Sequence, residues 1–270
     1  MKGYPSLTPE QKREIIARIK EKGERVADLA KEYGVQPRII YGYLSRSAQS
    51  SGTLLELSKL KREKEAEIKT ILDVGGGPGS ILEFLSPKRY NFYILDKNAK
   101  VLNKIKNQRV EKVLGDGCDL PFPDNFFDTA ISIDTLEHIP ENEKGIFCSE
   151  LKRVAKKYVI IHCPADSFDG KFQGTNYDER FLEWYRKRFR KDEENTLEHL
   201  NSGLPKIEEL VSLFPGASII GKQNGEVWLK YMKQEMTPYI RFIAGLFYKL
   251  FLSKKDDLPP YHACLIMWGK

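Results

Sequence analysis

From residue 68 onwards, short apolar runs alternate with stretches that are polar or carry apolar residues at helical spacing. Runs of this length, bounded by Gly, Pro or Asp, are typical of buried strands. We expect strands at 68–74, 91–95, 110–114, 127–133, 157–162, 217–220 and 261–268. Strands that alternate with helices form a mostly parallel sheet with helices on its faces, so the pattern predicts one α/β domain over residues 70–270.

The first seventy residues lack such runs and predict short helices and a linker instead. Thr8-Pro9-Glu10 is a typical helix start, with a capping hydroxyl, a proline at the first helical position and an acid in the first turn. Apolar residues then recur at helical spacing in three segments. We therefore expect a small all-α module at 1–47, followed by a linker and a charged helix at 48–69.

Part of this module, Val26–Val35, resembles the helix-turn-helix of transposases, invertases and bacterial regulators. Small Ala30 matches the position where two helices cross, and Gly34 matches the turn that needs positive φ. The resemblance implies a recognition helix in the major groove of DNA. Its implied DNA contacts are Gln36, Arg38, Tyr41 and Arg46. A docking or dimerisation module would show the same pattern, and the sequence leaves both interpretations open.

The charge of the chain is concentrated in the same region. The 270 residues carry 44 Lys and Arg against 38 Asp and Glu, a net charge of +6. Residues 1–70 contain 15 of the basic and 10 of the acidic side chains, so nearly all of the excess lies there. A basic segment ahead of a near-neutral body favours a nucleic-acid partner, although a solvated helical face gives the same balance.

The cysteines and the N-terminal segment both point to a reducing compartment. The four cysteines are too widely spaced for the close pairs typical of zinc sites, so we expect buried free thiols and no bound metal. They are Cys118, Cys148, Cys163 and Cys264. The first residues form no apolar run of the kind found in signal peptides, and we expect a cytoplasmic protein.

One apolar segment, 239–252, does not fit the pattern of the sheet and lies in an expected apolar helical insertion at 226–258. It contains Arg241 and Lys249 and is shorter than the roughly 20 residues of a membrane-spanning helix. Three interpretations stay open for it: peripheral contact with a membrane, cover over a lipid-like substrate, and packing against a second copy in a homodimer.

The clearest chemistry follows the first strand, in Asp73, Gly75, Gly77 and Gly79. A strand, a glycine-dense turn and a helix form a nucleotide-binding unit, with the ligand beyond the carboxyl ends of the strands. The NAD fingerprint requires a glycine where Ser80 stands, which disfavours that cofactor. The acid and the alternating glycines instead resemble motif I of the class I methyltransferases that use S-adenosylmethionine (SAM).

This resemblance implies SAM as the cofactor and a Rossmann-like sheet of seven strands in the order 3-2-1-4-5-7-6, with strand 7 antiparallel. Asp96, at the end of the second strand, matches the residue that binds the ribose hydroxyls, and Asp116 matches the contact to the adenine amino group. Further cofactor contacts are implied at Lys97, Gly117, Asp134 and Leu136.

The segment Leu-Glu-His-Ile-Pro at 136–140 is typical of the methyltransferase branch that acts on small molecules, quinones and glycans. The resemblance places His138 toward the transferred methyl group, so His138 is the first candidate for a catalytic base and Glu137 the second. His199 is a further histidine able to reach an acceptor. We expect methyl transfer to an O or N of a small-molecule, glycan or lipid-linked acceptor.

An insertion at 164–205 is rich in aromatic and basic residues, which favours a cap over an acceptor with an apolar or planar part and an anionic part. An amphipathic helix with a solvated basic face explains the same composition. A competing interpretation of the whole chain is a DNA-binding transcriptional regulator whose methyltransferase-like domain senses SAM or a related ligand.

Overall fold

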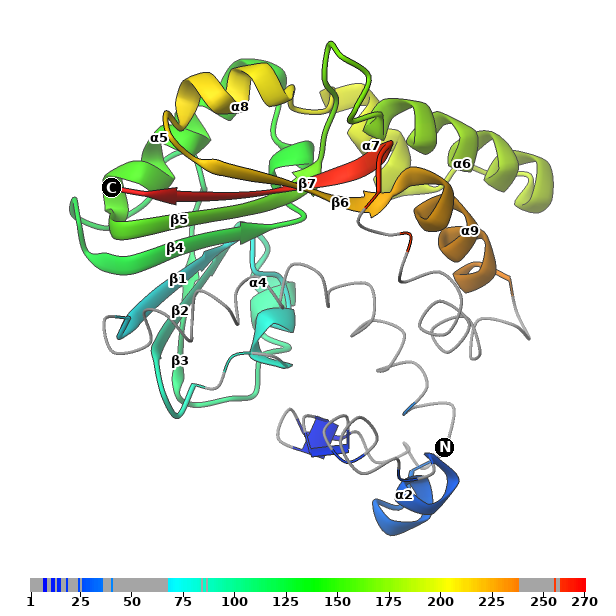
Figure 1. Ribbon diagram of the computed structural model, residues 1–270. Helices are drawn as coiled ribbons and strands as arrows, with labels where there is room; N and C mark the ends of the chain where they lie inside the picture. Colours follow the sequence, from blue (N-terminus) through cyan, green and yellow to red (C-terminus); the bar gives the residue numbers. More distant parts are fainter. Residues whose placement is uncertain are drawn as a thin grey trace.

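The computed structural model describes residues 68–83, 85, 87–237, 255 and 258–270, together with residues 7, 8, 11, 12, 14, 15, 18, 24, 26–35 and 40. Its centre is one sheet in the order β3-β2-β1-β4-β5-β7-β6 (Figure 1). The strands are β1 Thr70–Val74, β2 Asn91–Asp96, β3 Val110–Leu114, β4 Phe127–Ile133, β5 Ala155–Pro164, β6 Ser218–Asn224 and β7 Tyr261–Gly269. All seven expected strands are present, and the predicted order is confirmed.

Strands β1 to β5 pair in parallel, whereas β7 runs antiparallel to both β5 and β6. The central strands β1 and β4 are mostly buried because helices cover both of their faces, whereas the edge strand β3 exposes most of its residues. In β1, for example, every residue from Ile71 to Val74 is buried. The predicted antiparallel strand 7 is confirmed as well.

Helices enclose the sheet from both sides (Figure 1). On one face, α5 Lys144–Val154 and α8 Ile207–Leu213 pack against the strands through Phe147, Leu151 and Leu210. On the other, α4 Ala99–Leu102 and the 3-10 helix η2 Ser80–Glu83 contribute Leu102, Ile81 and Leu82 to a second core. The two cores fix the strand ends on which the candidate site is built.

The segment after the glycine-rich turn is helical, as a strand, turn and helix unit requires. It begins with a 3-10 turn over Ser80–Glu83, in which the amide of Leu82 donates to the carbonyl of Gly79. The amide of Leu85 donates to the carbonyl of Ile81 at 3.0 Å, so helical hydrogen bonding reaches residue 85.

Three helices gather beyond the carboxyl end of β5 (Figure 1). They are α6 Gly174–Phe189, α7 Glu194–Ser202 and α9 Gly225–Glu235. Phe181 of α6 packs on Trp228 of α9, with ring centroids 5.7 Å apart. The insertion at 164–205 is thus folded and helical, and its apolar face is covered by α9. Residues 239–252 lie outside the described residues, and none of the described helices is long and apolar enough to cross a membrane.

The described part of the N-terminal module contains α2 Val26–Glu32 and a small apolar cluster. The cluster consists of Leu7, Ile15, Leu29, Ala30, Val35 and Ile40. Gly34 has a φ of 63°, as the turn requires. Such a cluster suits many three-helix units, and the implied DNA contacts Gln36, Arg38, Tyr41 and Arg46 lie outside the described residues. DNA binding therefore stays a prediction.

Two cysteines of the main domain lie close together without forming a disulfide. The Sγ atoms of Cys163 and Cys264 are 3.9 Å apart on paired strands, and all four cysteines are free. Three are buried as expected, whereas Cys118 is partly exposed because it lies in the loop after β3.

Candidate active site

The glycine loop after β1 packs tightly between two neighbouring strand ends. Gly75, Gly77 and Gly79 all have positive φ, between 53° and 79°. The amide of Gly75 donates to the carbonyl of Leu95 at 2.8 Å. A Cβ atom on Gly75 would lie 2.3 Å from Oγ1 of Thr135, in the loop after β4. Glycine is required here both by the backbone angle and by the lack of space.

Asp96 holds this loop from the end of β2. Its Oδ2 accepts the amide of Gly77 at 3.0 Å, and its Oδ1 accepts the amide of Asn98 at 2.8 Å. Each carboxylate oxygen has a second lone pair, so both can still accept a ligand hydroxyl. The side chain is only partly buried. Its placement suits the predicted contact with a ribose.

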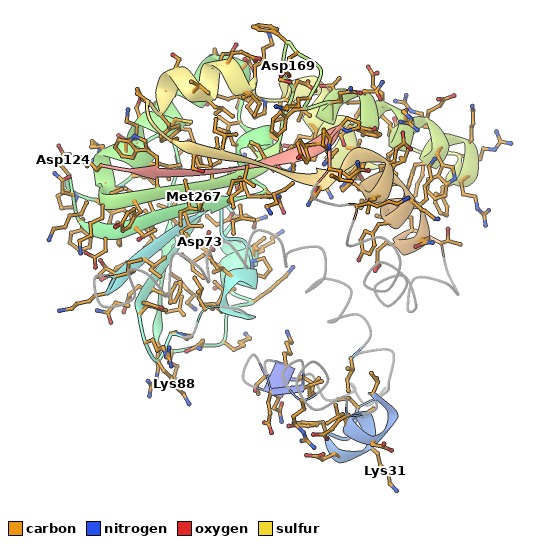
Figure 2. The ribbon with its side chains drawn as sticks, viewed as in Figure 1. Lys31, Asp73, Lys88, Asp124, Asp169 and Met267 are labelled. Carbon is orange, nitrogen blue, oxygen red and sulfur yellow. The ribbon has the colours of Figure 1, made fainter. Side chains whose placement is uncertain are left out.

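Asp73 lies almost fully buried on the central strand β1, at 3% exposure (Figure 2). Burial, and then the nearby charge of Asp96, raise the pKa of the Asp73 carboxyl to about 7. A positively charged group beside this pair would favour its ionised form. Glycines that admit a ligand to the backbone and acids that attract a cation with hydroxyl groups match the needs of SAM.

The other implied cofactor residues differ in how accessible they are. Asp116 is exposed after β3, and its Oδ1 accepts the amide of Cys118 at 2.8 Å. A Cβ atom on Gly117 would lie 2.4 Å from the ring of Phe147, so this position also needs glycine. Lys97 is exposed. Leu136 differs from them because it is fully buried in the main core, and its implied contact with the cofactor stays a prediction.

The loop after β4 carries the candidate catalytic residues on the 3-10 helix η3 Leu136–His138. Asp134, at the start of this loop, has a φ of 51°. Its Oδ1 lies 2.8 Å from Nδ1 of His162 on β5. Glu137 is buried, at 1% exposure, and burial and then the charge of Asp134 raise its pKa well above the ordinary value. His138 is partly buried, and burial and then His199 lower its pKa.

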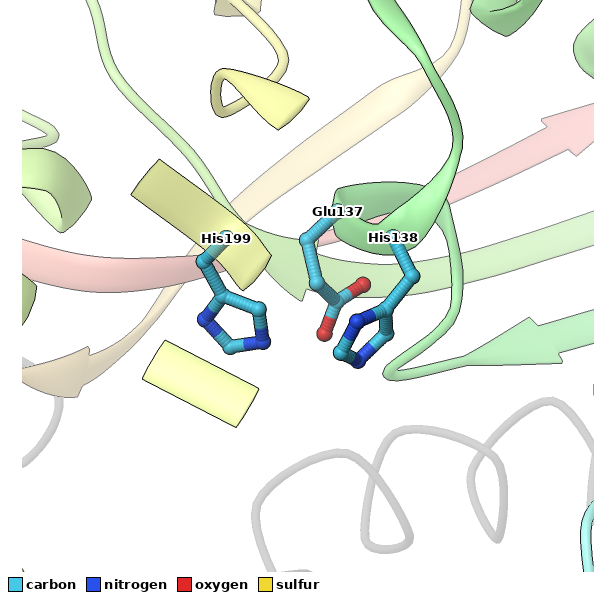
Figure 3. Close-up of side chains that lie close together, drawn as sticks. All are labelled: Glu137, His138 and His199. Carbon is cyan, nitrogen blue, oxygen red and sulfur yellow. The ribbon is translucent and has the colours of Figure 1, made fainter. Parts of the chain in front are cut away.

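His199 of α7 is brought directly to this loop. The rings of His138 and His199 are 4.7 Å apart between centroids. One donor atom from each of Glu137, His138 and His199 lies within 4.8 Å of the other two, and the three side chains point toward one another (Figure 3). The sequence suggested His199 as a residue able to reach the acceptor, but its position beside Glu137 depends on the fold of the insertion.

A buried carboxylate behind His199 was missed in the sequence. Oδ2 of Asp178 lies 3.0 Å from Nδ1 of His199, and its Oδ1 lies 2.9 Å from Nε2 of His262. Nδ1 of His262 in turn lies 3.2 Å from Oε1 of Gln223, and Trp228 stacks on the His262 ring at 3.7 Å. The available signal was an acid on the apolar face of α6, next to Tyr177 and one turn before Phe181 and Leu182.

Lys144, at the start of α5, contacts both the loop after β4 and the end of α7. Its Nζ donates to the carbonyl of Ile139 at 2.8 Å, to Oε2 of Glu141 at 2.9 Å and to the carbonyl of Ser202 at 3.0 Å. Ile139 follows η3, and Ser202 ends α7. This buried ammonium group therefore holds the helix that carries His199 against the loop that carries His138.

Comparison with known proteins finds a similarity to a family in the same region. Residues 72–163 match the model of a methyltransferase domain. This match begins in β1 and ends in β5, so it contains the glycine loop, Asp96, Asp116 and His138 but not the insertion with His199.

Curated relatives are similar over the same part of the chain. Over 139 residues, 45% of this chain, the protein is 32% identical to 2-methyl-6-phytyl-1,4-hydroquinone methyltransferase of Spinacia oleracea, covering 39% of that protein. Over 109 residues, 37% of this chain, it is 29% identical to ajmaline N-methyltransferase of Rauvolfia serpentina, covering 36% of it. The chain thus spans about two fifths of the length of these relatives.

Solved structures share the fold. A SAM-dependent methyltransferase from Archaeoglobus fulgidus aligns with 80% of this chain and 93% of its own, with a TM-score of 0.51 and 16% identity. The plantazolicin methyltransferase, solved with a substrate analogue and SAH, aligns with 97% of this chain and 96% of its own, with a TM-score of 0.51 and 12% identity. At these identities the likeness establishes the Rossmann-like methyltransferase fold.

Proposed function

We propose that this protein transfers a methyl group from SAM to an O or N atom of a small-molecule acceptor. The proposal rests mainly on a glycine loop that has no room for a side chain at Gly75 or Gly76. Asp96 accepts a hydrogen bond from the same loop. The methyltransferase-domain match over residues 72–163 supports it. Two of the similar proteins are named as methyltransferases of a hydroquinone and of ajmaline, which supports a small-molecule acceptor.

The residues after β1, β2 and β3 fit the parts of the donor. Asp96 would accept the ribose hydroxyls, the glycine loop would lie against the adenosine and methionine parts, and Asp73 would favour the cationic end. Asp116 would accept the adenine amino group, since its carboxylate is exposed after the end of β3. When bound, SAM supplies an activated methyl group on a sulfonium, so the chain has only to align the acceptor with it and exclude water.

Glu137 and His138 would act on the acceptor. They lie directly after Thr135, whose Oγ1 contacts the carbonyl of Gly75 at 3.4 Å, so they follow the segment that touches the donor loop. The acceptor would enter from the side of α6 and α7, where His199 lies beside Glu137 and His138. Within this proposal, a glycan or a lipid-linked molecule is a more specific choice of acceptor.

Calorimetric titration with SAM and with its 2′-deoxy analogue tests the donor site. Asp96→Ala removes the acceptor of two hydroxyl groups, and hydrogen bonds to a charged group contribute about 1.5–3 kcal/mol each, so SAM affinity is expected to fall well over tenfold. The parent protein should bind the deoxy analogue less tightly than SAM, whereas Asp96→Ala should bind both alike. Equal SAM affinity in parent and variant contradicts the ribose assignment.

Acceptor identity needs a separate experiment. Extracts of small metabolites are incubated with the protein and SAM, and mass spectrometry searches for a product heavier by one methylene group. The product should require both protein and SAM and should be lost with Asp96→Ala. Absence of any such product, together with absence of SAM binding, contradicts the proposed activity.

A further inference from the structure

Two polar atoms at the candidate active site are buried without a hydrogen-bond partner: Oε2 of Glu137 and Nδ1 of His138. Nδ1 of His138 does lie 3.1 Å from Oε2 of the exposed Glu198, and the two form an ion pair only when the imidazole is protonated. A buried polar group left unpaired costs about 1–3 kcal/mol, and more if charged. Two such atoms side by side indicate that a ligand satisfies both.

The third donor, His199, has a defined orientation. The buried carboxylate of Asp178 lies 3.0 Å from its Nδ1 and therefore favours the tautomer with the proton on that nitrogen. Nε2 of His199 is then left with a free lone pair. Asp178 is itself held by His262, which contacts Gln223. A carboxylate that fixes a histidine from behind is the usual outer shell of a metal ligand.

We propose that Glu137, His138 and His199 bind a divalent transition-metal ion, with Zn²⁺ as the best match. Two imidazole nitrogens and one carboxylate oxygen are a common donor set for zinc sites that keep an open fourth position. Zinc lies about 2.0–2.2 Å from such ligands, which places ligand atoms of one ion roughly 3–4 Å apart. The three donors, already within 4.8 Å, need to move together by about an ångström or less.

The expectation of no metal came from the spacing of the cysteines. The fold brings together a donor set without cysteine, because α7 returns to the loop after β4. A catalytic base would need only one histidine. Three converging donors, one of them fixed by a buried carboxylate, exceed what a base requires and favour a bound ion.

The ion would serve the acceptor, an inference that rests on the proposed function. An acceptor hydroxyl in the open position would lose its proton to water more readily, since a bound cation lowers its pKa. Its oxygen would then form the bond to the methyl carbon while the bond from sulfur to that carbon breaks, leaving a neutral thioether. Metal binding itself requires neither SAM nor acceptor.

The test measures the metal directly on the full-length chain. Protein stripped with a chelator is titrated with ZnCl₂ in a calorimeter, and the metal content after dialysis is measured by mass spectrometry. One ion per chain is expected. His138→Ala and His199→Ala should lower Zn²⁺ affinity by at least a hundredfold, and Asp178→Asn, which changes only the outer shell, by about 10–100-fold.

Two matched variants control for other sites. Cys118→Ser removes the partly exposed thiol and His162→Asn removes a histidine outside the cluster, and both should keep the parent affinity. Circular dichroism verifies folding of each variant. Co²⁺ substitution adds a spectroscopic test: the parent should show the visible bands of a four-coordinate N/O site without thiolate charge transfer, and His199→Ala should lose them.

Three outcomes overturn the metal site: no stoichiometric binding by the parent, binding unaffected by both histidine variants, or binding lost in Cys118→Ser. Methyl transfer that continues unchanged in metal-free protein overturns the role on the acceptor, while the methyltransferase proposal stands. If the protein binds Zn²⁺ but does not bind SAM, the metal site stands and the proposed SAM site is overturned.

Discussion

Oδ2 of Asp178 lies 3.0 Å from Nδ1 of His199, and the carboxylate has no exposed surface. Its other oxygen is taken by His262, so one buried acid serves two histidines on different elements. Burial disfavours the charged form, but the two histidines outweigh it and keep the pKa of Asp178 below its ordinary value. This carboxylate links α6, α7 and β7 at the point where the candidate metal ligands converge.

Asp178→Ala should therefore destabilise the protein by about 3 kcal/mol, because the buried imidazole of His262 and the partly buried imidazole of His199 lose their acceptor at once. Urea denaturation followed by circular dichroism measures this free energy of unfolding. Asp192→Ala, which breaks the exposed pair with Arg186, is the matched control and should cost less than about 1 kcal/mol. Equal losses of unfolding free energy in the two variants would mean that the buried network stabilises the protein no more than an exposed ion pair does.

Asp73 should make the protein less stable as the pH rises. Its pKa is about 7 in the folded state against 3.8 ordinarily, so ionisation is disfavoured by folding. The folded state holds the proton longer than the unfolded state, and stability is lost between about pH 4 and pH 7. Asp73→Asn removes this cost, which is about 4 kcal/mol at most.

The variant should thus unfold at a higher temperature than the parent near pH 8 and at a similar temperature near pH 4. Scanning calorimetry across this range measures the difference. SAM affinity of Asp73→Asn should fall at the same time, because the charge that favours a cation is gone. A difference in stability that does not change with pH would contradict the buried ionisation.

Gly75→Ala should impair the donor loop. The new methyl group would lie 2.3 Å from Oγ1 of Thr135, and the φ of 72° is unfavourable for alanine. We expect a loss of about 1–3 kcal/mol in unfolding free energy and weaker SAM binding. Gly145→Ala in α5 is the control, since no atom lies within 4 Å of its Cβ and alanine favours helix. If Gly75→Ala changes neither the unfolding free energy nor SAM binding, the loop is not tightly packed against Thr135.

The fold and the donor side of the site could be predicted because their signals are local. Most strands contain a run of apolar residues, the glycine loop directly follows β1, and Asp96 is the last residue of β2. The acceptor side could not be predicted in the same way. Asp178 contacts His262, 84 residues later, and His199 meets His138 only because α7 folds back onto the loop after β4.

The burial of Leu136 could not be predicted from the local sequence either. Leu136 follows a polar loop, but its side chain turns inward and joins the core with Phe147. Its position depends on how the segment is placed against its neighbours rather than on its own pattern.

Lys144→Met should loosen the contact between the loop after β4 and α7. The ammonium group donates to carbonyl oxygens on both, and methionine can replace its aliphatic part but none of its hydrogen bonds. We expect a loss of about 1–3 kcal/mol in unfolding free energy and a lower Zn²⁺ affinity, because His138 and His199 are no longer held together.

Lys152→Met on the same helix is the matched control. Nζ of Lys152 donates to the carbonyl of Leu213, away from the cluster, so this variant should lose stability without losing Zn²⁺ affinity. If both variants bind Zn²⁺ as the parent does, Lys144 stabilises the fold but does not position the site.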